Sequence, residues 1–156
     1  MHPQARELRD AHSTGVQHFD DGPIAQRYGI DNSASPDIQA NLLITAQGLE
    51  QVRALLGAPI TIDSGFRCAA LNQAVNGAKN SAHLTGYAAD FLCPGYGQPV
   101  AIVQKIRDSE IAFDQLIQEG TWTHISFAPT LRAQVLTAHF TSEGTTYSPG
   151  LEESNS

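Results

Sequence analysis

One segment constrains the fold more than any other: residues 36–57 carry the signals of a long amphipathic helix with a defined start and end. Ser35 can cap this helix, Pro36 suits its first position, and Gly57 ends the run. Apolar side chains recur between these limits at helical spacing, at Ile38, Leu42, Leu49, Val52 and Leu56. Such a stripe is typical of a core helix, so we expect the rest of the chain to pack against it.

The hydrophobic period changes after this helix, and shorter elements are predicted. Strands are expected over residues 59–66 and 86–93, and helices over residues 69–75 and 99–108.

A hairpin is predicted further along the chain. Residues 113–118 and 122–127 are both rich in β-forming residues, and Gly120 and Thr121 between them can make a two-residue turn. Residues 131–140 fit a helix or a strand.

The predicted organisation is one core with two polar ends. Residues 1–35 are expected to form an N-terminal arm with a short helix over residues 23–28, and residues 141–156 a flexible tail. The core, residues 36–140, is expected to be an α+β domain with helices packed on a mostly antiparallel sheet.

Charge and composition exclude several classes of function. Nine Lys and Arg against 16 Asp and Glu give a formal net charge of -7, without a basic cluster, so no nucleic-acid partner is expected. No apolar run resembles a signal peptide or reaches the ~20 residues that span a bilayer. We therefore expect a monomer made in the cytoplasm without a transmembrane segment. Cys68 and Cys93, the only cysteines, are expected to stay reduced there.

The six histidines divide into two groups. Four lie in the polar arm or near the tail and are expected to be solvated: His2, His12, His18 and His139. His83, Asp90 and His124 instead make a set of two imidazoles and one carboxylate, which suits a zinc ion with an open fourth position. Gly86 lets the chain turn back between the first two. On spacing alone, a hydrogen-bonded core histidine is the more common explanation.

The sequence motifs around these residues are more specific for a protein family than the spacing is. They occur in the order SGFR (64–67), LN (71–72), SAHLTGYAADF (81–91) and WTHIS (122–126). In them the chain resembles the zinc D-alanyl-D-alanine carboxypeptidase family of peptidoglycan peptidases over about residues 18–150. Three weaker phrases resemble its compact phage and prophage branch: YGIDN (28–32), FDQLI (113–117) and YSPGL (147–151).

The resemblance implies a fold, a metal and a substrate. The fold would be the Hedgehog-like, D-Ala-D-Ala-peptidase-like α+β sheet. The corresponding residues of that family bind a catalytic zinc, which assigns His83, Asp90 and His124 as ligands. The substrate would be a cell-wall peptide that contains D-amino acids.

Hydrolysis also needs a carboxylate that takes a proton from the attacking water and delivers it to the leaving amine. Larger members of the family carry Glu or Asp three residues before the last histidine ligand, where this chain has Thr121. Glu119 is the nearest substitute, because across a two-residue turn it pairs with Trp122 and shares a face with His124. Asp114 is the competitor, which strand alternation places on the opposite face. A surface carboxylate at the hairpin tip is the alternative interpretation of Glu119.

Arg67 and Ser81 complete the predicted site. Arg67 resembles the family arginine, whose guanidinium can hold a peptide carboxylate or a developing oxyanion; a structural ion pair is the alternative. Ser81 resembles the serine that hydrogen-bonds substrate, and a loop cap is its alternative. Cys68 could instead act as a thiolate with His83 or His124 as base, but nothing in the sequence orients such a pair.

These observations predict a zinc-dependent peptidase that cleaves peptidoglycan stem peptides, as a D-Ala-D-Ala carboxypeptidase or an endopeptidase. The absence of a signal peptide fits a phage or prophage endolysin released by a holin, or a virion-borne wall hydrolase. The alternative is a catalytically idle module of the same fold that binds wall peptide or serves as a phage structural part.

Overall fold

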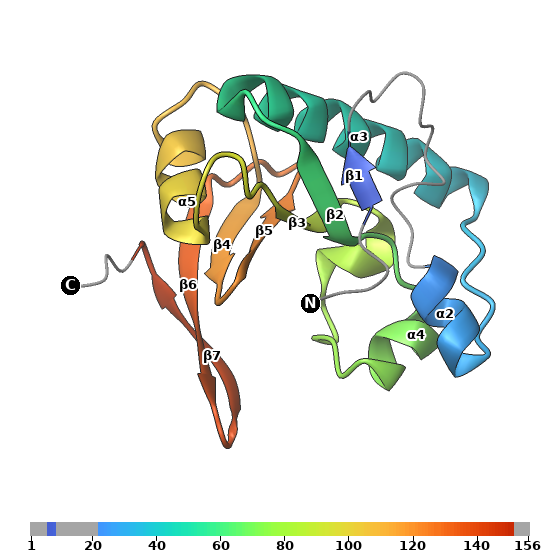
Figure 1. Cartoon of the computed structure of the whole chain (residues 1–156). Coiled ribbons are helices and arrows are strands. Elements are labelled where there is room, and N and C mark those ends of the chain that lie inside the picture. Colours follow the sequence, from blue (N-terminus) through green and yellow to red (C-terminus); the bar gives the residue numbers. More distant parts are fainter. Residues whose placement is uncertain (1–5, 9–21, 152–156) are drawn as a thin grey trace.

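The structure, a computed structural model, describes residues 6–8 and 22–151 (Figure 1). It is an α+β domain built on one seven-stranded sheet with the order β1-β2-β3-β5-β4-β6-β7. All neighbouring strands are antiparallel except β4 and β6, which are parallel. The predicted class, helices on a mostly antiparallel sheet, is confirmed.

The strands are β1 (Arg6–Leu8), β2 (Ile60–Ser64), β3 (Ala88–Leu92), β4 (Gln115–Glu119), β5 (Trp122–Ser126), β6 (Gln134–Thr141) and β7 (Gly144–Pro149). The helices are α2 (Gly22–Tyr28), α3 (Pro36–Leu56), α4 (Ala69–Ala74), the 3-10 helix η2 (Ala82–Thr85) and α5 (Pro99–Arg107). Among the residues that the structure describes, no helix is both long and apolar enough to cross a membrane.

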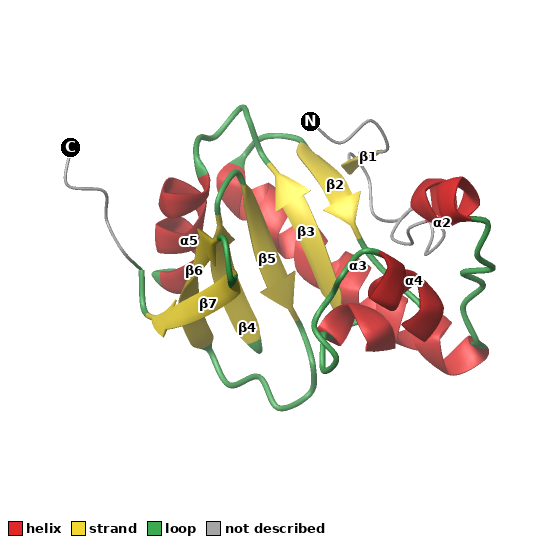
Figure 2. Cartoon of the chain, turned by 90° about the horizontal axis from the view of Figure 1, so that it is seen from below, coloured by secondary structure: helices red, strands yellow, loops and turns green. Residues whose placement is uncertain are grey.

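The long helix α3 has the predicted limits. The Ser35 hydroxyl accepts a hydrogen bond from the Ile38 amide at 3.3 Å, and the Gly57 amide donates to the Arg53 carbonyl at its end. The buried stripe includes Leu42, Leu49, Val52 and Leu56. It packs with α5 on one face of the sheet (Figure 2).

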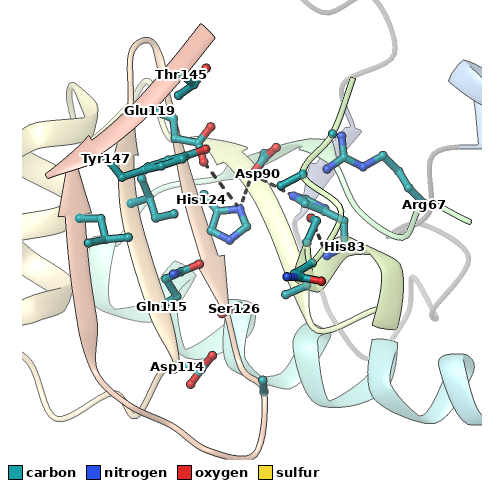
Figure 3. Close-up of a pocket in the computed structure, with 18 of the residues that line it drawn as sticks. Arg67, His83, Asp90, Asp114, Gln115, Glu119, His124, Ser126, Thr145 and Tyr147 are labelled. Carbon is teal, nitrogen blue, oxygen red and sulfur yellow. Dashed lines mark hydrogen bonds and ion pairs between the residues drawn. The ribbon is translucent and has the colours of Figure 1, made fainter. Parts of the chain in front are cut away.

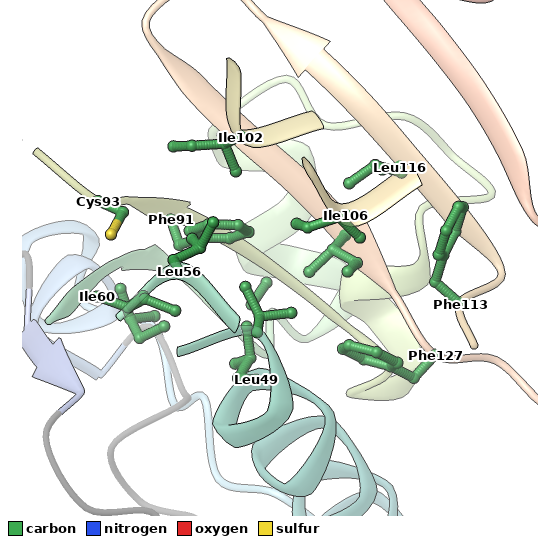
Figure 4. Packing of buried hydrophobic residues seen from close by; sticks show 14 of the residues in the cluster. Leu49, Leu56, Ile60, Phe91, Cys93, Ile102, Ile106, Phe113, Leu116 and Phe127 are labelled. Carbon is green, nitrogen blue, oxygen red and sulfur yellow. The ribbon is translucent and has the colours of Figure 1, made fainter. Parts of the chain in front are cut away.

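The core lies between these two helices and the sheet (Figure 4). Phe91 of β3, Leu116 of β4 and Ile125 of β5 are buried there against Ile102 and Ile106 of α5. Because side chains alternate along a strand, the residues next to these in each strand point to the other face of the sheet. The core thereby fixes the strands that carry the site.

The predicted hairpin is present as β4 and β5. Glu119 pairs with Trp122 across Gly120 and Thr121, as the two-residue turn requires. Residues 131–140, left open between helix and strand, contribute the strand β6.

The prediction of a flexible tail over residues 141–156 is wrong for residues 144–149. These form β7, which pairs with β6 along six residue pairs from Leu136–Pro149 to Thr141–Gly144. The strand is polar and mostly exposed, so it lacks the apolar alternation that identifies a half-buried strand. Backbone pairing to β6 defines it instead.

The predicted N-terminal arm is described only in part. It holds the expected short helix as α2 and also the edge strand β1, which pairs with β2 and was not predicted. The predictions for His2, His12 and His18 lie outside the described residues.

Candidate active site

An open pocket of about 800 Å³ lies on the sheet face opposite α3 and α5 (Figure 3). Alternate side chains of two neighbouring strands form its floor: Trp122, His124 and Ser126 from β5, and Gln115, Ile117 and Glu119 from β4. Residues 75–83 form one wall together with Arg67, and the β6–β7 hairpin forms another. The sequence predictions missed the hairpin wall because its second strand was expected to be a tail.

The three predicted metal ligands converge in this pocket. One ligand atom from each of His83, Asp90 and His124 lies within 4.8 Å of the others. An oxygen of Asp90, Oδ1, is 3.3 Å from His83 Nε2 and 2.9 Å from His124 Nδ1. Asp90 and His124 are direct partners across the β3–β5 ladder, so the sheet register sets their distance.

His83 is held in a fixed orientation. Its Nδ1 lies 2.7 Å from the Gly65 carbonyl, which can only accept, so Nδ1 carries the proton and Nε2 is left for the metal side. The ring is 2% exposed and comes from η2, which Gly86 ends in the left-handed conformation, at a φ of 81°. The tight turn lets the chain return as β3 with Asp90 facing His83.

The donor set fits zinc. Nitrogen and carboxylate ligands lie ~2.0–2.1 Å from the ion, so neighbouring ligands of a tetrahedral site are about 3.3 Å apart. The two contacts of Asp90 Oδ1, 3.3 and 2.9 Å, are close to that separation. Burial raises the pKa of Asp90, but the neighbouring His83 and His124 outweigh it and keep the pKa well below its usual range. The carboxylate is therefore ionised, as a metal ligand must be.

Glu119 lies beside this cluster, as the predicted register requires. Its Oε1 is 4.0 Å from His124 Nδ1, and its side chain is 15% exposed. Burial and the negative charge of Asp90 raise the pKa of Glu119 to about 7, against the opposing effects of His124, Arg67 and a hydrogen bond from Trp122. A carboxyl group with this pKa can both accept and return a proton at neutral pH.

Asp114 is placed differently from the prediction. It precedes β4, so strand alternation does not put it on the opposite face, and it lines the far end of the same pocket. Its carboxylate accepts hydrogen bonds from the Thr130 hydroxyl at 2.6 Å, the Arg132 amide at 3.1 Å, and Arg132 Nε and Nη2 at 2.9 Å each. The Arg132 guanidinium above all holds the pKa of Asp114 well below its usual range. We call these three residues the Asp114 clamp.

Arg67 and Ser81 both line the pocket. Arg67 lies on the His83 side of the cluster (Figure 3), and its positive charge opposes the rise in the pKa of Glu119. The Ser81 hydroxyl accepts a hydrogen bond from the His83 amide at 3.2 Å, which is the predicted loop cap. Its own O–H can still donate to a ligand in the pocket. Their roles toward substrate stay predictions.

The thiol interpretation gains no support from the structure. Both cysteines are free; the Cys68 thiol donates to the Asp31 carbonyl at 3.6 Å and is not among the residues that line the pocket. Cys93 is buried in the core, and burial raises the pKa of its thiol. His139, expected to be solvated, is half-buried and lies 2.8 Å from the Ser148 hydroxyl, because the β6–β7 ladder brings their strands together.

Comparison with known proteins gives two matches. The sequence model of the Peptidase M15 family matches residues 17–126 of this chain. A zinc D-Ala-D-Ala carboxypeptidase from Streptomyces albus G is 45% identical over 53 residues, which are 33% of this chain and 21% of that protein. The match therefore spans about a fifth of the relative's length. The three predicted metal ligands, which we call the metal cluster, are His83, Asp90 and His124. All three lie within the family match.

Proposed function

Because this chain belongs to the peptidase M15 family, we propose that it is a zinc metallopeptidase that cleaves peptide bonds in the stem peptides of bacterial peptidoglycan. One observation carries the proposal: His83, Asp90 and His124 converge in an open pocket, with the Glu119 carboxylate 4.0 Å from the cluster. The relative from Streptomyces albus G is named for zinc and for D-Ala-D-Ala, which supports a wall peptide as the substrate class.

Two imidazole nitrogens and one carboxylate oxygen would hold the metal, and this number of protein ligands is typical of catalytic zinc. When bound, zinc supplies a Lewis acid that polarises the scissile carbonyl and makes water easier to deprotonate. The Gly65 carbonyl keeps His83 in the tautomer that presents Nε2.

Glu119 would move the proton. In hydrolysis, the water oxygen bonds to the carbonyl carbon, the C–N bond breaks, and one proton travels from water to the leaving amine nitrogen. Glu119 accepts that proton and returns it, because its carboxylate lies at the metal site, with Oε1 4.0 Å from His124 Nδ1. Arg67, on the other side of the cluster, can donate two hydrogen bonds to a peptide carboxylate or to the developing oxyanion.

We further propose a phage or prophage role, as an endolysin or a virion-borne hydrolase that is made in the cytoplasm and reaches the wall after release. The phrases YGIDN, FDQLI and YSPGL support this role through their resemblance to the phage branch. Expression in a bacterial host with and without a holin tests it. Lysis that needs the holin is expected, whereas lysis at the same rate without the holin would contradict release as the controlling step.

The experiment that tests the peptidase proposal combines metal analysis with product analysis. We expect one zinc per chain in the purified protein, and occupancy far below one in His83→Ala, Asp90→Ala and His124→Ala. Glu110→Gln, at an exposed carboxylate that follows α5 in the chain, is the matched control and should keep full occupancy. Mass spectrometry of fragments from digested peptidoglycan then identifies the bond that is cut. Zinc binding without cleavage would favour the catalytically idle module instead.

A further inference from the structure

The sheet face that carries the metal cluster continues onto the β6–β7 hairpin. Ala138 pairs with Tyr147 and Phe140 with Thr145, so these residues share one face. Four hairpin side chains line the pocket: Leu136, Phe140, Thr145 and Tyr147. The family match ends at residue 126, so the comparisons assign no role to this wall.

The hairpin is held in place near both ends of β6. Near the tip of the hairpin, the Phe140 ring packs on Trp122 with 5.9 Å between ring centroids. Gly120 permits this approach, because its φ is 61° and a Cβ there would lie 3.0 Å from the Phe140 ring. At the start of β6, the Asp114 clamp fixes the loop that crosses from β5. The wall therefore has a defined position relative to Glu119.

Tyr147 projects from the hairpin into the site. Its ring extends from β7 toward Glu119 and His124 (Figure 3), and the residue is 49% exposed, so a ligand can contact it. Burial and the negative charges of Glu119 and Asp90 raise the pKa of Tyr147, so its phenol keeps its proton and acts as a hydrogen-bond donor.

We propose that the β6–β7 hairpin is a substrate-binding wall and that the Tyr147 phenol donates a hydrogen bond to a backbone carbonyl of the bound peptide. This inference rests on the proposed peptidase function. Tyr147 and Arg67 lie on opposite sides of the metal cluster, so an extended peptide that crosses the cluster meets a donor on each side. Phe140 and Trp122 add apolar surface beside the donor, which suits the methyl groups of alanine residues.

Trp122 provides a test that does not depend on turnover. It is the only tryptophan of the chain and lines the pocket beside Phe140, so its fluorescence reports peptide binding at this wall. The zinc-loaded protein is mixed in a stopped-flow instrument with the soluble stem pentapeptide L-Ala-D-Glu-L-Lys-D-Ala-D-Ala. Wild type is compared with Tyr147→Phe and with Tyr28→Phe, a matched control that removes the hydroxyl of an exposed tyrosine on α2.

Tyr147→Phe should weaken peptide binding about 2- to 10-fold, the net worth of one neutral hydrogen bond. Its KM should rise with little change in kcat, because the contact exists before and during reaction. Zinc content should not change, and Tyr28→Phe should bind like wild type. Equal peptide affinity in wild type and Tyr147→Phe would overturn the inference.

The same experiment separates this inference from the proposed function. If wild type binds the pentapeptide without cleaving it or peptidoglycan, and Tyr147→Phe weakens binding, the wall is supported and the peptidase function is overturned. If zinc-loaded wild type neither binds nor cleaves, both are overturned.

Discussion

Each end of the pocket holds a carboxyl group at one end of β4, and the surroundings shift the pKa values of the two groups in opposite directions. Glu119 ends β4 at the metal cluster, where burial and the Asp90 charge raise its pKa to about 7. Asp114 precedes β4 at the other end, where the Asp114 clamp lowers its pKa. Only four residues of β4, 115–118, thus separate a carboxyl group that can exchange a proton from one that stays ionised.

The difference follows from the number and kind of donors around each group. The carboxylate of Asp114 accepts four hydrogen bonds, two of them from a guanidinium, so the charged form is strongly favoured. Glu119 is buried beside another negative charge, which favours the neutral form. Carboxylates whose pKa values are driven apart in one site have different roles, and we expect Glu119 to transfer protons and Asp114 to support the structure.

Replacing Glu119 gives the largest expected effect and tests the comparison directly. Glu119→Gln keeps the size of the side chain but cannot accept a proton, so turnover should fall ~10²-fold or more while zinc content stays the same. Asp114→Asn is the matched control, and steady-state kinetics with zinc analysis should show a much smaller loss of turnover. A fully active Glu119→Gln beside an inactive Asp114→Asn would reverse the roles of the two ends.

Arg67→Lys tests the role of the guanidinium at the end of the pocket that holds the metal cluster. Lysine keeps the positive charge but loses the planar pair of donors, so kcat/KM should fall about 10-fold while zinc is retained. The measurement is kinetics with metal analysis of the same preparation. Unchanged kcat/KM would mean that Arg67 contributes only its charge to the pocket.

The sequence predicts most of the metal end, because its signals are local or belong to the family motif. The caps of α3 and the two-residue turn that pairs Glu119 with Trp122 are short-range features, and the structure has both. The sequence motifs around His83, Asp90 and His124 identified these three residues as candidate metal ligands, and the folded sheet brings them together.

The clamp end could not be predicted in the same way. Arg132 lies 18 residues after Asp114 and meets it only because the loop from β5 to β6 crosses the start of β4. Leu131 and Ala133 beside it have φ values of 42° and 55°, which no sequence signal for a turn marks. The strand β7 also depends on a nonlocal ladder, since its polar sequence has no pattern of its own.

Replacing Asp114 in the Asp114 clamp should have the smallest effect on turnover and should lower the stability of the fold instead. Asp114→Asn replaces a buried acceptor of four hydrogen bonds, so the free energy of unfolding should fall by about 1–3 kcal/mol at pH 7. Urea unfolding followed by Trp122 fluorescence measures this loss, with Asp108→Asn, an exposed carboxylate after α5, as the control.

The pH dependence of the same unfolding gives the sharper test. The pKa of Asp114 is lower in the folded protein than its ordinary value of 3.8. Its contribution to stability is therefore fully present above about pH 4 to 5 and is lost as pH falls through the folded value. Wild type should therefore lose more stability than Asp114→Asn between pH 5 and pH 2. If the free energy of unfolding changes with pH in the same way in both proteins, the ionised form of Asp114 does not stabilise the fold. The contrast between Asp114 and Glu119 would then be wrong.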